Sequence, residues 1–523
     1  MSWIEVCAQA ELQERGRMVV RVAGRQILLL STEAGLFACV NRCPHEGYPL
    51  SEGRLAEGCI LTCDWHNWKF DLARGATLVG GDLLPRFPVR VENGRVSIDV
   101  TPEDRAKRRH AILAALPQAL ADVDQQRLVR EVARLVRFDG DPVDAVRAAI
   151  AWAGERFEFG TTHAIAGAPD WLRLHDDPAI GSDEKLAAIG EIVGHIADDV
   201  RGERIFPFHT GPSPWNEAAF QDAVERQAED EAISLLRGAL AGGHTTDDLL
   251  PAFVVAALAH YADFGHALIY VMQTAALIRR LGPEASETLL LNLTRSLIFA
   301  TREDLLPEFR SYAAELAHWG KRDPQPFGAA ALNSKSAKAA MAIVSGWAAT
   351  HVPEQIFDVL VEANAWTLLH ADEAKMRAVD AKLADNINWL DFTHALTFAE
   401  AGLRAMQLRP DLWPALLLQL ACFSGRNAGY GDTSRDRYAE FAVADISGFL
   451  AARRTQLFDH GCERFIISVH LTKTLLAGTT LIERLPALAP LLAAALHRFL
   501  TARMKGRHVL RTARQMRDLV EHE

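Results

Sequence analysis

The chain has 523 residues, of which 49% are hydrophobic and 24% are charged, and its net charge is −11. This length and balance predict a globular protein with more than one domain. The acidic balance and the lack of a basic stripe argue against nucleic acid as a partner. The seven cysteines are an odd number, and the first residues do not read as a signal peptide. We therefore expect a cytoplasmic protein without a disulfide framework.

Two regions with different hydrophobic periods divide the chain. In residues 1–100, short runs rich in Val, Ile and Leu alternate with Gly and charged turns, and Asn93-Gly94 lies between two alternating runs. These patterns predict a small all-β domain with a hairpin near its end. We interpret the charged segment 101–112 as a linker. In residues 113–523, Ala and Leu dominate and apolar residues recur at steps of three and four, which predicts a large all-α bundle. The expected fold class is α+β multidomain.

Two Cys–His pairs lie in the β region, Cys43-Pro-His45 and Cys63-Asp-Trp-His66. Two thiolates and two imidazoles can hold zinc, although zinc motifs more often pair Cys with Cys and His with His. Here each of two hairpin tips supplies one residue of each type. That layout favours a [2Fe–2S] cluster in which the thiolates bind one iron and the imidazoles bind the other.

Together with its flanking residues, including WKFDLARG at 68–75, this segment resembles a Rieske domain of the ferredoxin and oxygenase type. High-potential Rieske domains have a disulfide where this chain has Tyr48 and Trp65, so the resemblance implies a potential toward the lower end of the Rieske range. Asn67 departs from the family pattern, which has Gly there. A Rieske cluster transfers single electrons. We therefore expect an external NAD(P)H-dependent reductase or ferredoxin as a partner.

One apolar segment of the helical region, 252–281, carries a polar stripe. It is long enough to suggest a membrane span, but its polar side chains would be costly in lipid, so we expect one buried helix and no membrane partner. On one helix, an arc of about 140° would hold His260, Asp263, His266, Tyr270 and Gln273. For any single histidine, a hydrogen-bonded core residue is the simpler interpretation. The whole stripe predicts a buried polar cavity with Asp263, Tyr270 and Gln273 as candidate catalytic residues.

Three more histidines share this helical setting: His163 after a Gly-Thr-Thr helix start, His394 three residues after Asp391, and His470 with Lys473 one turn later. Asp391 is a further candidate catalytic residue that could orient a histidine. Stretches such as TTHAIAGAPDWL (161–172) and VHLTKTLLAG (469–478) resemble the questin oxidase-like family, over roughly 140–480. The resemblance implies one iron held by four histidines and a carboxylated lysine, and these roles fall on His163, His266, His394, His470 and Lys473.

These features predict an O2-dependent mono- or dioxygenase. In this hypothesis the cluster delivers electrons to a mononuclear non-heme Fe(II), which activates O2 against a small aromatic or quinone-like substrate. Neutral imidazoles and a hard carbamate oxygen suit Fe(II). Two alternatives stay open: an electron carrier or redox scaffold with no second metal, and a carboxylate-bridged diiron oxygenase. The second would use three pairs with one spacing, Asp263-x-x-His266, Glu315-x-x-His318 and Asp391-x-x-His394.

Overall fold

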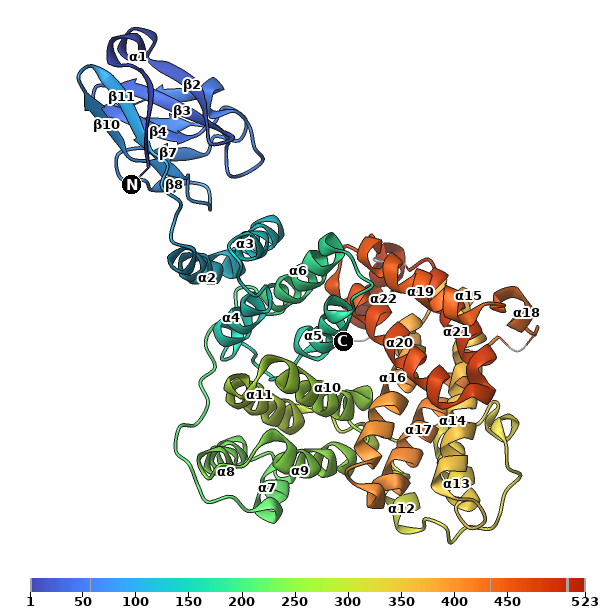
Figure 1. The fold of residues 1–523 in the computed structure, drawn as a ribbon. Helices are drawn as coiled ribbons and strands as arrows, with labels where there is room; N and C mark the ends of the chain where they lie inside the picture. The colour runs from blue at the N-terminus through green and yellow to red at the C-terminus, as the bar shows by residue number, and fades with distance from the viewer. Residues whose placement is uncertain (1, 57, 433, 505–507, 522–523) are drawn as a thin grey trace. The chain divides into compact units, whose positions relative to one another are not determined.

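The chain folds into two compact units, Met1–Asp141 and Pro142–Glu523, and Figure 1 labels most of their helices and strands. The structure is a computed structural model that describes residues 2–56, 58–432, 434–504 and 508–521. The first unit begins with strands, and the second is helical. The predicted fold class, a small β domain followed by a large helical domain, is therefore confirmed.

Three small antiparallel sheets form the β part of the first unit. The first sheet has the order β1 (Trp3–Ala8), β11 (Arg95–Asp99), β10 (Val89–Glu92). The second has the order β2 (Arg17–Val22), β3 (Arg25–Thr32), β4 (Gly35–Val40), β9 (Arg86–Phe87). The third has the order β5 (Arg54–Ala56), β6 (Ile60–Thr62), β7 (Lys69–Asp71), β8 (Thr77–Val79).

Strand β3 shows how the sequence pattern sets the two cores of this unit. Its residues Leu28 and Leu30 pack in one core, whereas Ile27 and Leu29 pack in the other. This alternation is expected because successive side chains of a strand point to opposite faces. The hairpin predicted at Asn93-Gly94 joins β10 to β11, and both of its turn residues have the positive φ that a two-residue turn requires.

The structure differs from the predicted linker at residues 101–112. Helix α2 (Arg105–Ala121) begins inside that segment, and with α3 (Gln125–Arg137) it belongs to the first compact unit. Asp104 caps α2 by accepting the N–H of Lys107 at 3.0 Å. Since Lys, Arg and Ala are strong helix formers, the charge of this segment belongs to a helix rather than to a linker.

Helices joined by loops and short 3₁₀ turns build the second unit. They are α4 (Val143–Ala153), α5 (His163–Asp176), α6 (Ser182–Asp199), α7 (Glu217–Glu225), α8 (Glu229–Ala241), α9 (Thr246–Ala259), α10 (His266–Leu281), α11 (Ser286–Phe299), α12 (Tyr312–Ala317), α13 (Ala337–Trp347), α14 (Pro353–Leu369), α15 (Glu373–Arg377), α16 (Trp389–Met406), α17 (Trp413–Asn427), α18 (Tyr438–Phe441), α19 (Ile446–Gln456), α20 (Phe465–Arg484), α21 (Ala489–Thr501) and α22 (Val509–Glu521). Four of them close a ring in which α5 packs against α10, α10 against α16, α16 against α20, and α20 against α5.

The prediction of one helix over 252–281 is wrong. The structure has two helices, α9 and α10, separated by a turn. In that turn Asp263, Phe264 and Gly265 have φ values of 46°, 60° and 78°, which a continuous right-handed helix does not allow. His266 consequently begins a helix instead of lying in the middle of one.

The segment that follows α11 holds this turn. The N–H of Asp263 donates to the carbonyl of Thr301 at 2.9 Å, and the N–H of Asp304 donates to the carbonyl of Tyr261 at 3.2 Å. These bonds replace the helical hydrogen bonds that the turn gives up. Because the partners lie far along the chain, the apolar pattern of 252–281 did not reveal them.

Helix α20 alone among the described residues is long and apolar enough, by length and composition, to cross a membrane. However, 72% of its apolar window is buried inside the protein, and His470 and Lys473 lie within it. Burial in the core of the helical unit accounts for its apolar character.

Candidate metal centres

Two loops of the first unit bring together its predicted Cys and His ligands. Cys43 and Cys63 are buried in one hydrophobic core and interact directly. The Nδ1 atoms of His45 and His66 are 3.1 Å apart. The loops therefore present two thiols on the inside and two imidazoles on the outside, as the predicted [2Fe–2S] cluster requires.

The two loops share one backbone form. The N–H of Gly47 donates to the carbonyl of Cys43, and the N–H of Asn67 donates to the carbonyl of Cys63, each at 2.9 Å. Gly47 and Asn67 have φ values of 79° and 58°. Asn adopts this left-handed conformation more readily than most residues, so Asn67 stands in for glycine and the loop keeps its shape.

The surroundings of the loops fit a cluster. Burial raises the pKa of the Cys43 thiol to about 11, so a thiolate at this position needs a compensating cation such as iron. Trp68 stacks on His45 with ring centroids 4.8 Å apart, and Trp65 stacks on His66 at 5.1 Å. These contacts hold both imidazoles, which stay partly exposed to solvent.

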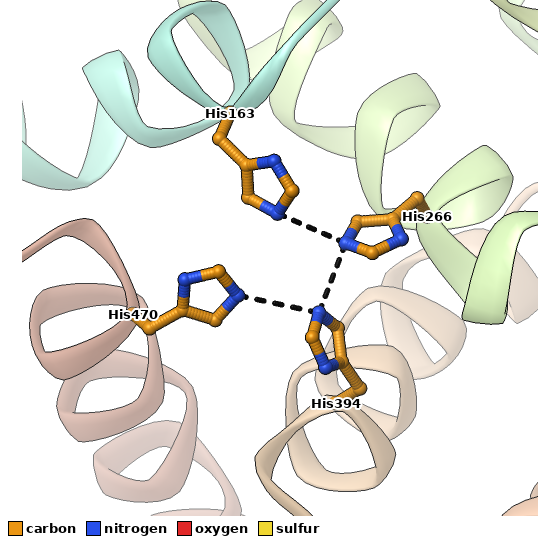
Figure 2. Close-up of side chains that lie close together, drawn as sticks. All are labelled: His163, His266, His394 and His470. Atoms are coloured by element: carbon orange, nitrogen blue, oxygen red, sulfur yellow. Dashed lines mark hydrogen bonds between the residues drawn. The ribbon is translucent and has the colours of Figure 1, made fainter. Parts of the chain in front are cut away.

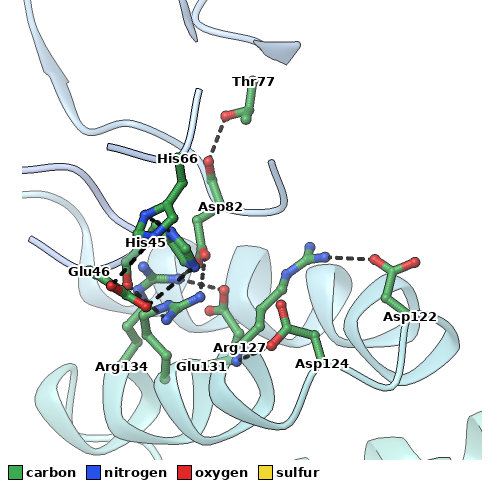
Figure 3. Close-up of polar contacts among 11 residues, drawn as sticks. His45, Glu46, His66, Thr77, Asp82, Asp122, Asp124, Arg127, Glu131 and Arg134 are labelled. Atoms are coloured by element: carbon green, nitrogen blue, oxygen red, sulfur yellow. Dashed lines mark hydrogen bonds and ion pairs between the residues drawn. The ribbon is translucent and has the colours of Figure 1, made fainter. Parts of the chain in front are cut away.

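Helix α3 contacts the loop that carries His45 (Figure 3). Arg130 donates to the carbonyl of His45 at 3.2 Å and to the carboxylate of Asp82 at 2.7 Å, and Arg134 also pairs with Asp82. Burial acts to raise the pKa of Asp82, but the hydrogen bonds and charges of the two arginines lower it below its usual value. A cationic side chain therefore lies beside a predicted cluster ligand, held there by a buried carboxylate.

Four histidines from the ring of helices meet in the second unit (Figure 2): His163 from α5, His266 from α10, His394 from α16 and His470 from α20. Their Nε2 atoms face one another. The separations are 3.0 Å between His163 and His266, 2.9 Å between His266 and His394, and 3.3 Å between His394 and His470. We call this group the histidine tetrad; its members are the four histidines that the family resemblance indicated.

Hydrogen bonds at Nδ1 decide which ring nitrogens are free. His266, His394 and His470 each place Nδ1 against a backbone carbonyl oxygen. A carbonyl only accepts, so each Nδ1 carries the proton and each Nε2 keeps a lone pair. Lone pairs that face one another at this distance repel unless a cation lies between them. Metal–nitrogen bonds of about 2.1 Å would separate adjacent ligands by about 3.0 Å, in agreement with the tetrad.

The pKa values of the tetrad favour metal binding. Burial, assisted by the charge of Lys473, lowers the pKa of His266 to about 3 and that of the other three histidines well below the usual range. Neutral imidazoles are the form that binds metals. Lys473 is only 6% exposed, and burial lowers its pKa to about 7. Among the described residues its amine makes no hydrogen bond or ion pair, and a neutral amine of this kind is nucleophilic.

Comparison with known proteins decides the family of the first unit. A family model, the Rieske [2Fe-2S] domain, matches residues 2–82. The ferredoxin component of the alkene monooxygenase system of Xanthobacter autotrophicus is 33% identical over 103 residues, which cover 84% of that protein and 20% of this chain. The chain belongs to the Rieske [2Fe–2S] family. The ferredoxin component of the naphthalene 1,2-dioxygenase system of Pseudomonas putida is 32% identical over 103 residues, covering 98% of that protein and 19% of this chain.

Longer proteins match over the Rieske domain as well. The 4beta-methylsterol monooxygenase of Methylococcus capsulatus is 33% identical over 128 residues, which are 22% of this chain and 34% of that protein. The terminal oxygenase of carbazole 1,9a-dioxygenase from Nocardioides aromaticivorans is 25% identical, with a TM-score of 0.19, over 20% of this chain and 31% of that chain. These matches cover about a fifth of the chain and leave the helical unit unnamed.

Three of the residues predicted to be catalytic have different surroundings. Tyr270 places its hydroxyl 3.3 Å from Nδ1 of His163. Asp263 accepts Nδ1–H of His266 through its backbone carbonyl, while its carboxylate accepts the N–H of Thr301. Gln273 donates to Asp170 at 2.7 Å and contacts no tetrad ring. Of these three residues, Tyr270 and Asp263 therefore contact a tetrad histidine directly.

A group of contacts that the sequence analysis missed surrounds Arg426 of α17. Its guanidinium stacks on Phe264 at 3.5 Å from the ring centroid, and it pairs with Glu303 at 3.6 Å and with Asp391 at 3.7 Å. The ring of Phe264 meets that of His394 edge-on, with centroids 5.1 Å apart. The carboxylate of Asp391 thus faces Arg426 and not the His394 ring that it was expected to orient. Arg426 lies outside every local sequence motif, and no pattern in the sequence indicated it.

The three carboxylate–histidine pairs do not assemble a diiron site. Glu315 pairs with Arg322, and His318 places Nδ1 against the carbonyl of Ala314. Within the described part of the chain, the groups of His, Cys, Asp and Glu close enough to share a metal are the tetrad and His45, Glu46 and His66.

Two cavities lie at the tetrad or one helical turn beyond it. The larger, of about 600 Å³, begins one turn beyond three of the histidines, at Ile269, Thr397 and Lys473. The smaller, of about 320 Å³, is lined by His163 itself together with Tyr270. Both volumes fall within the range of small-molecule sites.

Proposed function

We propose that the chain is an O2-dependent oxygenase whose Rieske domain supplies electrons to a mononuclear Fe(II) in the helical unit. Cys43, His45, Cys63 and His66 would hold the [2Fe–2S] cluster. The tetrad, with Lys473 as a carboxylated ligand, would hold the iron. The observation that carries the proposal is the set of Nε2 lone pairs that face one another at 2.9–3.3 Å. A bound iron would supply O2 activation for the oxidation of a small aromatic or quinone-like substrate.

The residues of the chain prepare this centre before any metal binds. Nδ1–H bonds to backbone carbonyls fix three rings with Nε2 turned inward. The hydroxyl of Tyr270 can accept Nδ1–H of His163 and fix the fourth. Burial lowers the pKa of the rings and so keeps them neutral. These features pre-organise a ligand set, which is what tight metal binding requires.

Electrons would reach the Rieske domain from an external NAD(P)H-dependent reductase or ferredoxin. Support comes from the curated relatives, which are ferredoxin components of a monooxygenase and a dioxygenase system. Fusion of the two units would keep the electron donor at a high effective concentration near its acceptor. A cytoplasmic location and the absence of a membrane partner remain predictions.

Replacement of His266 by Ala tests the iron assignment. In anaerobically purified protein, this variant should lose the iron of the helical unit and keep the EPR signal of the reduced Rieske cluster. His370→Ala is the matched control, because His370 is also buried in the helical unit but lies outside the tetrad. A His266 variant that retains both metals would refute the assignment. Wild-type protein without iron beyond the cluster would favour the carrier or scaffold alternative.

A further inference from the structure

The smaller cavity has an aromatic rim. Phe159 and Phe299, which are 60% and 47% exposed, line it, and their rings meet edge-to-face with centroids 5.6 Å apart. Two large exposed aromatic side chains in mutual contact leave apolar surface in water, which often marks a binding site. Such a pair offers both a ring face and a ring edge to a third aromatic ring.

Polar groups without partners lie further inside the same cavity. Thr161 and Thr162 line it, and their hydroxyls are buried without a hydrogen-bond partner among the described residues. Buried hydroxyls are normally satisfied in native proteins. A ligand with a hydroxyl or carbonyl group would provide the missing hydrogen bonds at this position, next to His163.

The charge of the lining restricts the ligand further. Asp199 and Asp263 are its carboxylates, and no Lys or Arg of the described residues lines it. An anionic ligand would meet these carboxylates without a Lys or Arg side chain to compensate its charge. The larger cavity differs in the charge of its lining, because arginines such as Arg173 and Arg454 contribute to it.

We propose that the smaller cavity is the substrate site and that it selects uncharged aromatic molecules carrying a hydroxyl or carbonyl group over aromatic acids. The ring lies against Phe159 and Phe299, and its polar group reaches Thr161 or Thr162, which brings the molecule beside His163. The volume of about 320 Å³ suits one or two fused rings. The assignment rests on the proposed function, because iron at the tetrad is what makes this cavity a reaction site.

Binding to the full chain without O2 tests the proposal independently of turnover. The probes are 1-naphthol and 1-naphthoate, which share a ring system but differ in charge, and fluorescence follows their binding. Wild-type protein should bind 1-naphthol at least about tenfold more tightly than 1-naphthoate, a difference expected for an unpaired charge. Phe159→Ala and Phe299→Ala should each weaken 1-naphthol binding about 3- to 10-fold. Asp199→Asn removes one carboxylate of the lining, so it should reduce the difference in affinity between 1-naphthol and 1-naphthoate.

Phe327→Ala is the matched control, since Phe327 is an exposed phenylalanine of the same unit that lines neither cavity. The proposal is overturned if 1-naphthol does not bind, or if both rim variants bind it as wild type does. A preference for 1-naphthoate that Arg454→Ala abolishes would move the site to the larger cavity. Iron analysis of the same samples separates the two proposals. Rim-dependent binding without helical iron would refute the oxygenase while the aromatic site stands, and helical iron without rim-dependent binding would refute the site alone.

Discussion

Arg426 joins the segments that present His266 and His394, so its replacement should loosen the tetrad without removing a ligand. Arg426→Gln removes the cation stacked on Phe264 and breaks the ion pair with Glu303. Glu303 accepts the N–H of Phe264 at 3.1 Å. The change therefore weakens two of the contacts that hold the left-handed turn before α10.

The contacts set the size of the effect. A cation–π contact contributes about 0.5–2 kcal/mol, and an ion pair at a partly exposed position contributes up to about 1 kcal/mol. Three consecutive residues with positive φ lie in the turn, and a non-glycine residue in this conformation depends on its surroundings to stay there. Together the two contacts amount to about 0.5–3 kcal/mol, which corresponds to a loss of roughly 2- to 100-fold in iron affinity.

Competition with a chelator under anaerobic conditions measures this affinity, and the EPR signal of the Rieske cluster serves as an internal standard. We expect weaker Fe(II) binding by the helical unit and an unchanged cluster signal. Arg453→Gln is the control, because Arg453 also stacks on a phenylalanine but lies on α19, which supplies no tetrad histidine. Unchanged Fe(II) affinity in a folded Arg426 variant would refute the positioning role.

Three further predictions concern other parts of the chain. Arg130→Gln removes a cation beside a cluster ligand, so the midpoint potential of the cluster should fall in a redox titration, whereas Arg137→Gln, exposed on the same helix, should leave it unchanged. Lys473→Ala should weaken iron binding by the helical unit, and added acetate should restore part of it by supplying a carboxylate oxygen. Hydrogen bonding to Asp304 raises the pKa of His260, so protonated His260 stabilises the fold. At pH values below about 6.5, the His260→Gln variant should therefore unfold at a lower temperature than the wild type. That difference should vanish as the pH rises through the raised pKa.

Each of these predictions has a result that contradicts it. Equal potentials in the Arg130 and Arg137 variants would mean that the contact with the loop does not influence the cluster. Iron content unaffected by the loss of Lys473 would exclude this lysine as a ligand. A difference in thermal midpoint that stays constant with pH would show that the His260 interaction does not depend on its charge.

Local chemistry explains what the sequence could predict. The two Cys–His loops are short motifs in which neighbouring residues determine the backbone, and Asn93-Gly94 specifies its own turn. The tetrad was indicated by family resemblance together with polar residues in apolar helices. Its assembly depends on packing among α5, α10, α16 and α20, which hydrophobic periodicity alone does not specify.

Long-range contacts explain what the sequence did not reveal. The turn between α9 and α10 is held by residues 301–304, and Arg426 acts across three segments that are far apart in the chain. For the turn and for Arg426, the deciding partners lie far along the chain, outside the window in which a local pattern is recognised. Helix α2 differs from these two cases, because its helix-forming residues and the cap at Asp104 are local signals, and the linker prediction rested on the charge of the segment alone.

The ratio of iron to acid-labile sulfide in the anaerobically purified chain tests the central claim most directly. A Rieske cluster accounts for two irons and two sulfides, and the account predicts a third iron that His266→Ala removes. Three irons for two sulfides would agree with a mononuclear centre at the tetrad. Two irons for two sulfides, unchanged after anaerobic addition of Fe(II), would contradict the claim and leave the helical unit without a metal.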